Sequence, residues 1–162
     1  MSGKYKQSGF TIVELLIVIV VIAILAAISV VAYNGIQQRA TKTTLQNDLS
    51  NFSKNIEIVR IDSTDGKYPS TLTAAMGFRL SKNAYMIDRY NAYYCLNSDR
   101  SKYAFGVVSS HGDQYVLTPT EGITTHPSVY GDSTCVAAGA TTGSNAGHTY
   151  LNNVNSWQPW TN

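Results

Sequence analysis

One acidic residue, Glu14, stands close to the start of a long apolar stretch near the N-terminus. The run from Leu15 to Val31 reads LLIVIVVIAILAAISVV, and Ser29 is its only polar residue. A carboxylate at the centre of a membrane-spanning helix costs about 2.5–3.5 kcal/mol on insertion scales. We therefore expect Glu14 to be paired, neutralised or functional.

The two cysteines, Cys95 and Cys135, are the other residues with distinctive chemistry. An even pair in an exported domain indicates a disulfide first, with two free structural thiols as the alternative. His111, His126 and His148 lie far apart, without the spacing of a metal site. The sequence has no phosphate-binding glycine motif and no nucleophile elbow. We therefore expect no catalytic residues, no metal and no cofactor.

The apolar stretch is long enough to cross a bilayer. At about 1.5 Å per residue, a helix from Phe10 to Ala32 would cover roughly 34 Å, against a hydrocarbon core of about 30 Å. Lys4 and Lys6 precede it, so the positive-inside rule places the N-terminus in the cytoplasm and the rest of the chain outside. A secretory signal peptide, an ordinary signal anchor and a buried core helix are alternatives, but none of them explains Glu14.

The residues from Gly9 to Leu16, GFTIVELL, closely resemble the N-terminal signature of type IV prepilins and the related pseudopilins. In that family a membrane aspartyl peptidase removes a short basic leader that ends in glycine, and the new N-terminal phenylalanine is methylated. The resemblance implies cleavage between Gly9 and Phe10 and N-methylation of Phe10. It covers about the first quarter of the chain. Many family members carry proline at the position that corresponds to Val31 of this chain.

The resemblance gives Glu14 a physical role in assembly. Cleavage would create a cationic amine at Phe10, with a reference pKa of about 7.7–8.0. In an apolar filament core both charges are costly unless they meet. We expect the amine of one subunit to pair with Glu14 of a neighbour and to fix the axial register. An amine–carboxylate pair within one subunit is the alternative.

Beyond the apolar stretch the helix is predicted to continue to about Arg60 as an amphipathic helix. Apolar residues recur at spacings of three and four along one face: Leu45, Leu49, Phe52, Ile56 and Val59. The charged residues are expected largely off that face, in solvent: Arg39, Lys42, Asp48, Lys54, Glu57 and Arg60. Turn residues at 62–66 and Pro69 predict the end of the helix.

Short runs of apolar and aromatic residues predict strands at 93–96, 103–108 and 114–118. The last two are expected to form a hairpin, and a weaker strand is predicted near 128–130 or at Val136. A short helix is predicted within 70–76. An antiparallel sheet packed on the amphipathic half of the helix would bury both apolar faces, which is an α+β, pilin-like fold.

The composition fits a small folded body attached to an apolar segment. The chain has 162 residues, of which 44% are hydrophobic and 14% charged. Its formal net charge is +2, and Lys4 and Lys6 account for the excess, so charge does not indicate a nucleic-acid-binding surface.

With the resemblance, the sequence predicts a leader at 1–9, a membrane and filament-core helix at 10–33, and a globular domain at 34–162. The implied protein is a type IV pilin, matured by a prepilin peptidase and polymerised with identical subunits by an assembly machinery. It would leave the cytoplasmic membrane for an extracellular filament serving adhesion, motility or DNA uptake. The resemblance also implies that the disulfide bounds a variable C-terminal region. A pseudopilin of a secretion or competence system is one alternative, and a non-polymerising, membrane-anchored surface binding protein is another.

Overall fold

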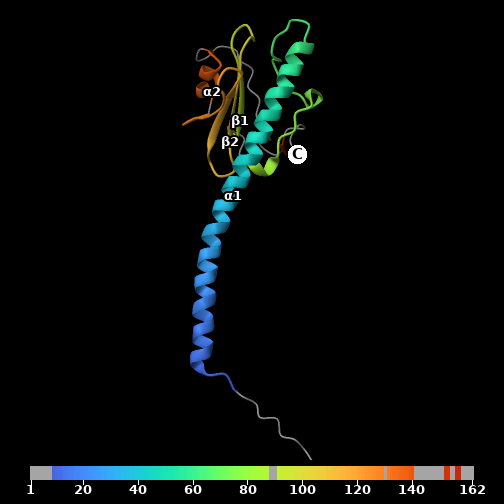
Figure 1. Ribbon diagram of the computed structural model, residues 1–162. Helices are drawn as coiled ribbons and strands as arrows, with labels where there is room; N and C mark the ends of the chain where they lie inside the picture. The colour runs from blue at the N-terminus through green and yellow to red at the C-terminus, as the bar shows by residue number, and fades with distance from the viewer. Residues whose placement is uncertain (1–8, 88–90, 130, 141–151, 154–155, 158–162) are drawn as a thin grey trace, which may run out of the picture. The chain divides into compact units, whose positions relative to one another are not determined.

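The computed structural model describes residues 9–87, 91–129, 131–140, 152–153 and 156–157, beginning with a long helix (Figure 1). This helix, α1, spans Ile12–Asp62 and confirms the single continuous helix predicted from the sequence. Val31 and Gly35 both lie in helical backbone. The chain divides into two compact units, Met1–Gln38 and Arg39–Asn162, and the boundary falls within α1.

The other elements of the second unit are short. Two 3₁₀ turns follow α1: η1 (Ala74–Met76) and η2 (Lys82–Ala84). The main strands are β1 (Ala92–Leu96), β2 (Tyr103–Val108), β3 (Gln114–Thr118) and β4 (Gly122–Thr125). They are followed by α2 (Asp132–Ala137) and by the paired strands β5 (Asn152–Asn153) and β6 (Ser156–Trp157). Strands β1 to β4 pair in chain order as an antiparallel sheet.

The three predicted strands and the β2–β3 hairpin are confirmed, whereas the fourth strand was predicted in the wrong place. Neither candidate position is a strand, because Val129 lies in a loop and Val136 lies in α2. The fourth strand is β4, which the sequence analysis missed. Gly122 adopts a φ of 70° after β3 and turns the chain back onto it. As an edge strand of mostly polar residues, β4 lacks the run of apolar and aromatic residues that marked the other strands.

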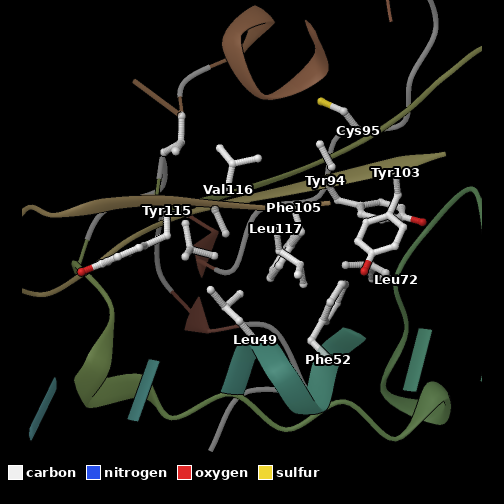
Figure 2. Packing of buried hydrophobic residues seen from close by; sticks show 14 of the residues in the cluster. Leu49, Phe52, Leu72, Tyr94, Cys95, Tyr103, Phe105, Tyr115, Val116 and Leu117 are labelled. Atoms are coloured by element: carbon white, nitrogen blue, oxygen red, sulfur yellow. The ribbon is translucent and has the colours of Figure 1, made fainter. Parts of the chain in front are cut away.

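The core of the second unit lies between α1 and one face of the sheet. Phe52 of α1 stacks on Phe105 of β2, with ring centroids 4.2 Å apart. Figure 2 shows Leu49 and Phe52 facing Phe105 and Leu117 across this layer. Leu45, Leu49, Phe52 and Ile56 are buried, as their spacing predicted.

Helix α2 covers the opposite face of the sheet. Its close approach depends on Gly106 in β2, because a Cβ atom there would lie 2.4 Å from the Oγ1 of Thr134. The Thr134 hydroxyl is buried and donates a hydrogen bond of 2.6 Å to the carbonyl oxygen of Val129. The absence of a Cβ atom at Gly106 therefore leaves space for Thr134, whose hydrogen bond anchors the loop before α2.

Candidate processing and assembly site

The residues of the predicted cleavage site lie outside the helix. Gly9, Phe10 and Thr11 are non-helical, and α1 begins at Ile12. A backbone hydrogen bond of 3.3 Å joins the N–H of Leu15 to the carbonyl of Thr11 at the start of α1. The bond between Gly9 and Phe10 therefore precedes the first helical residue.

Thr11 and Glu14 form a reciprocal cap at this helix start. The backbone N–H of Glu14 donates to the Thr11 Oγ1 at 3.2 Å. In return, the Glu14 Oε2 accepts from the backbone N–H and from the hydroxyl of Thr11, both at 2.7 Å. This arrangement is a capping box, in which two otherwise unpaired donors of the first turn are satisfied.

The sequence analysis identified Glu14 but missed Thr11 as its neighbour in this box. The spacing of threonine and glutamate, three residues apart before an apolar run, is the signal that could have found it. The carboxylate thus has hydrogen-bond donors within its own turn. Whether it also meets an amine in a filament stays a prediction.

The helix that follows carries a continuous apolar surface. Phe10 is 84% exposed, and every Val, Leu and Ile from Ile12 to Val31 is exposed as well. By length and composition α1 could cross a membrane, since its most apolar window has a mean hydropathy of 3.4. A surface of this kind indicates contact with lipid or with other protein, because water does not solvate it favourably.

Cys95 and Cys135 form a disulfide in the structure. The bond joins β1 to α2, with 4.9 Å between the Cα atoms and a sequence separation of 40. Both cysteines are buried. Strands β2, β3 and β4 lie in the closed loop, so the disulfide fastens both ends of that segment to each other.

Asp48 contradicts the expectation that the charged residues of α1 face solvent. Its side chain is buried and accepts hydrogen bonds from the Ser81 backbone N–H, at 2.7 Å, and from the Tyr85 hydroxyl, at 3.1 Å. Burial raises the pKa of Asp48, an effect that these hydrogen bonds partly oppose. The burial of Asp48 follows from helix geometry, because residue 48 lies next to Leu45 and Leu49 on the buried face of α1.

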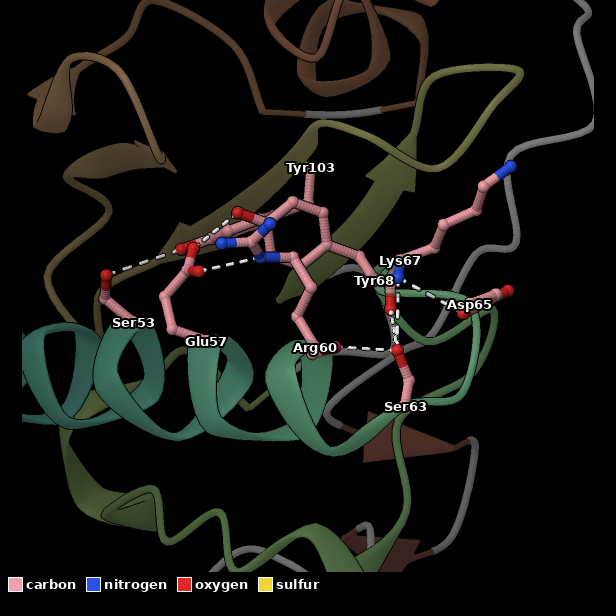
Figure 3. Close-up of polar contacts among 8 residues, drawn as sticks. All are labelled: Ser53, Glu57, Arg60, Ser63, Asp65, Lys67, Tyr68 and Tyr103. Carbon is pink, nitrogen blue, oxygen red and sulfur yellow. Dashed lines mark hydrogen bonds and ion pairs between the residues drawn. The ribbon is translucent and has the colours of Figure 1, made fainter.

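A second polar cluster lies at the C-terminal end of α1 (Figure 3). Glu57 accepts hydrogen bonds from the Tyr68 hydroxyl and, at 2.9 Å, from the Arg60 Nε. The Arg60 guanidinium also lies 5.3 Å from the centre of the Tyr68 ring. Burial raises the pKa of Tyr68, and it raises the pKa of the neighbouring Tyr103 to about 12.

Among the residues that the structure describes, no histidine belongs to a group of metal-binding side chains. His111 is exposed, His126 is half-buried, and His148 lies outside the described residues. Within the part of the chain that the structure describes, no group of three or more His, Cys, Asp or Glu side chains could hold a metal ion.

The comparison with known families points to the same N-terminal segment. Residues 4–30 match the family model of the prokaryotic N-terminal methylation motif. The chain is 33% identical over 91 residues to the type IV major fimbrial protein FimA of Dichelobacter nodosus, covering 52% of this chain and 58% of that protein. No solved structure matches the chain.

Two secretion proteins are similar over a shorter range. The chain is 30% identical over 70 residues to the type II secretion system core protein G of Pectobacterium carotovorum subsp. carotovorum, covering 43% of this chain and 44% of that protein. It is 31% identical over 68 residues to the Aeromonas hydrophila core protein G, covering 42% and 46%. The chain spans about half the length of the curated relatives it matches. The chain therefore carries the prokaryotic N-terminal methylation motif and is a distant homologue of FimA and of the type II secretion core G proteins.

Proposed function

We propose that this protein is a structural subunit of a type IV pilus. A prepilin peptidase removes residues 1–9 by cleaving between Gly9 and Phe10, and the new amino group of Phe10 is methylated. The subunits then polymerise through their N-terminal helices into a surface filament. The observation that carries this proposal is an apolar, exposed helix that begins two residues after Phe10 and holds Glu14 in its first turn.

The matched methylation motif supports the processing step. Methylation of an N-terminus at Phe10 requires a free amino group, which only removal of the preceding residues can supply. The non-helical backbone at Gly9 and Phe10 is compatible with that removal. The new amine carries a positive charge at neutral pH, since the reference pKa of an α-amino group is about 7.7–8.0.

The apolar surface supports the assembly step. Before assembly, residues 10–33 would lie in the cytoplasmic membrane, with residues 34–162 as a globular domain outside. In the filament, the same apolar helices would pack against each other and the disulfide-bonded domains would face outward. The amine of Phe10 would then meet Glu14 of a neighbouring subunit, because neither charge is stable alone in an apolar core.

A pseudopilin of a type II secretion system is the second candidate, favoured by the similarity to two core G proteins. Such a subunit would use the same cleavage and the same helix, but in an assembly that stays within the cell envelope. The two candidates therefore differ in where the processed chain accumulates.

Shearing of cells followed by mass spectrometry of the released filaments tests the proposal. We expect the N-terminal peptide of this protein to begin at N-methylated Phe10 in the sheared fraction. A processed chain found only in the membrane fraction would favour the pseudopilin. A chain that still begins near Met1 and is absent from filaments would overturn both, and would leave a membrane-anchored surface protein.

A further inference from the structure

The capping box of α1 lies directly beside the bond proposed for cleavage. We propose that Thr11 is a positioning residue for leader removal: its side chain ends the helix at Ile12 and keeps the Gly9–Phe10 peptide bond out of the helix. This inference rests on the proposed function, and it assigns to Thr11 a role distinct from that of Glu14.

The hydrogen bonds show how Thr11 stops the helix. In a continued α-helix, the N–H of Glu14 would donate to the carbonyl of residue 10, four positions earlier. In the structure that N–H donates to the Thr11 Oγ1 instead, at 3.2 Å. The N–H of Thr11 would likewise bond to an earlier carbonyl, but it donates to the Glu14 Oε2 at 2.7 Å. These two N–H groups would otherwise extend the helical hydrogen bonds toward the leader, but both already have acceptors within the capping box.

The N–H groups at the start of α1 need acceptors, because the helix that follows is apolar. The first turn of α1 continues into an apolar helix that could lie in lipid, where an unpaired N–H costs several kcal/mol. Without the threonine hydroxyl, the N–H groups of Val13 and Glu14 would bond to the carbonyls of Gly9 and Phe10. The carbonyl of Gly9 is the one that a peptidase must attack. A helical hydrogen bond to it would withdraw it from the enzyme.

The two residues of the box then serve different steps. The bond that keeps the Glu14 N–H from the carbonyl of Phe10 joins that N–H to the Thr11 side chain, so it does not require the glutamate carboxylate. Glu14→Ala would free the N–H of Thr11, but the helical partner of that N–H is the carbonyl of residue 7, which is not part of the bond to be cleaved. Leader removal should depend on the side chain at position 11 and tolerate Glu14→Ala. Assembly should depend on the carboxylate at position 14.

The experiment measures cleavage of the full-length chain in detergent micelles by a purified prepilin peptidase, with initial rates taken by mass spectrometry. Thr11→Val keeps the shape of the side chain but removes the hydrogen-bond acceptor, and we expect kcat/KM to fall about fivefold. Thr11→Ser and Glu14→Ala should stay within about twofold of the unsubstituted chain. Thr43→Val is the matched control, because the Thr43 hydroxyl also bonds within α1, to the carbonyl of Arg39 at 3.0 Å.

A second measurement separates positioning from direct recognition by the peptidase. The ¹³Cα chemical shifts of Gly9 and Phe10 in the labelled chain should move toward helical values in Thr11→Val and return in Thr11→Ser. Cleavage of Thr11→Val at the unsubstituted rate would overturn the inference. Slow cleavage without a change in these shifts would also overturn it, because Thr11 would then act by contact with the enzyme. If the unsubstituted chain is not cleaved at all, the proposed function itself fails.

Discussion

The carboxylate of Asp48 on α1 accepts a hydrogen bond from the hydroxyl of Tyr85, with 3.1 Å between Oδ2 and Oη. The same oxygen accepts from the backbone N–H of Ser81 at 2.7 Å. One buried side chain of α1 thus fastens the segment around η2 to the helix. The sequence pattern had placed this carboxylate in solvent, so its contribution to stability is a property of the tertiary structure.

Replacing Asp48 with alanine is expected to destabilise the folded chain by about 2–4 kcal/mol. The substitution leaves the N–H of the half-buried Ser81 and the hydroxyl of the buried Tyr85 without their acceptor, and an unpaired buried group costs about 1–3 kcal/mol. The measurement is denaturant unfolding of the full-length chain in detergent micelles, followed by near-ultraviolet circular dichroism. A loss below about 0.5 kcal/mol would contradict the assigned hydrogen bonds.

Asp48→Asn is the matched variant, because an amide oxygen can accept the same two hydrogen bonds. Burial raises the pKa of Asp48 above its usual value of 3.8, so the folded chain binds this proton more tightly than the unfolded chain. Its contribution is therefore most favourable below pH 3.8 and declines as the pH rises through the raised pKa. The asparagine variant should lack this decline. Parallel pH profiles for the two chains would disprove the assignment.

Gly106→Ala is expected to destabilise the second unit by about 1–3 kcal/mol, the usual effect of overpacking. The new Cβ would lie 2.4 Å from the Thr134 Oγ1 and 2.9 Å from the Val129 Cβ, so α2 would have to move. Thermal unfolding of the full chain measures the loss. Gly35→Ala is the control, because no atom lies within 4 Å of its added Cβ and it should stabilise α1 slightly.

Removal of the disulfide is expected to lower the free energy of unfolding by about 3–4 kcal/mol. Cys95 and Cys135 are separated by 40 positions, and opening a loop of that length restores entropy to the unfolded chain in the chain-entropy account. Unfolding with and without dithiothreitol measures the effect, and the double variant Cys95→Ala/Cys135→Ala should not respond to the reductant. Equal stability of the oxidised and reduced chains would refute the expectation.

The chain is expected to lose stability between pH 10 and pH 12. Burial raises the pKa of Tyr103 to about 12 from its usual value of 10, so the folded chain keeps a proton that the unfolded chain has lost. This contribution is complete below pH 10 and reaches a loss of about 2 kcal/mol near pH 12. Unfolding curves across this range, with tyrosinate absorbance at 295 nm, test it. The Tyr103→Phe variant should show a shallower decline.

Glu14→Ala is expected to leave membrane insertion intact and to abolish filament assembly. The substitution removes the carboxylate that the Phe10 amine is proposed to meet, and the amine would then enter an apolar core without a counter-charge. Membrane fractionation measures insertion, and electron microscopy of sheared filaments measures assembly. A normal filament yield from this variant would rule out the proposed pairing.

Local patterns in the sequence determined the extent of α1, its apolar first half, the buried face of its second half and three of the four strands in the main sheet. The buried face of α1 follows from periodicity, because side chains at a period near 3.6 share one face of a helix. The three strands follow from short runs of apolar and aromatic residues bounded by turn residues. Strand β4 was missed because an edge strand between a turn and solvent needs little apolar content, and its position is set by pairing with β3.

The N-terminal site was also largely local. The apolar run, its acidic residue and the glycine before Phe10 all lie within one short segment, and the Thr11–Glu14 box was present in the sequence although it was not identified. Three other contacts join residues that are distant in the chain. They are the hydrogen bond between the buried Asp48 and Tyr85, the approach of α2 to Gly106, and the hydrogen bond between Glu57 and Tyr68. Only the tertiary structure decided these contacts, because they depend on which surfaces meet after folding, and no spacing within a single element specifies a partner on another.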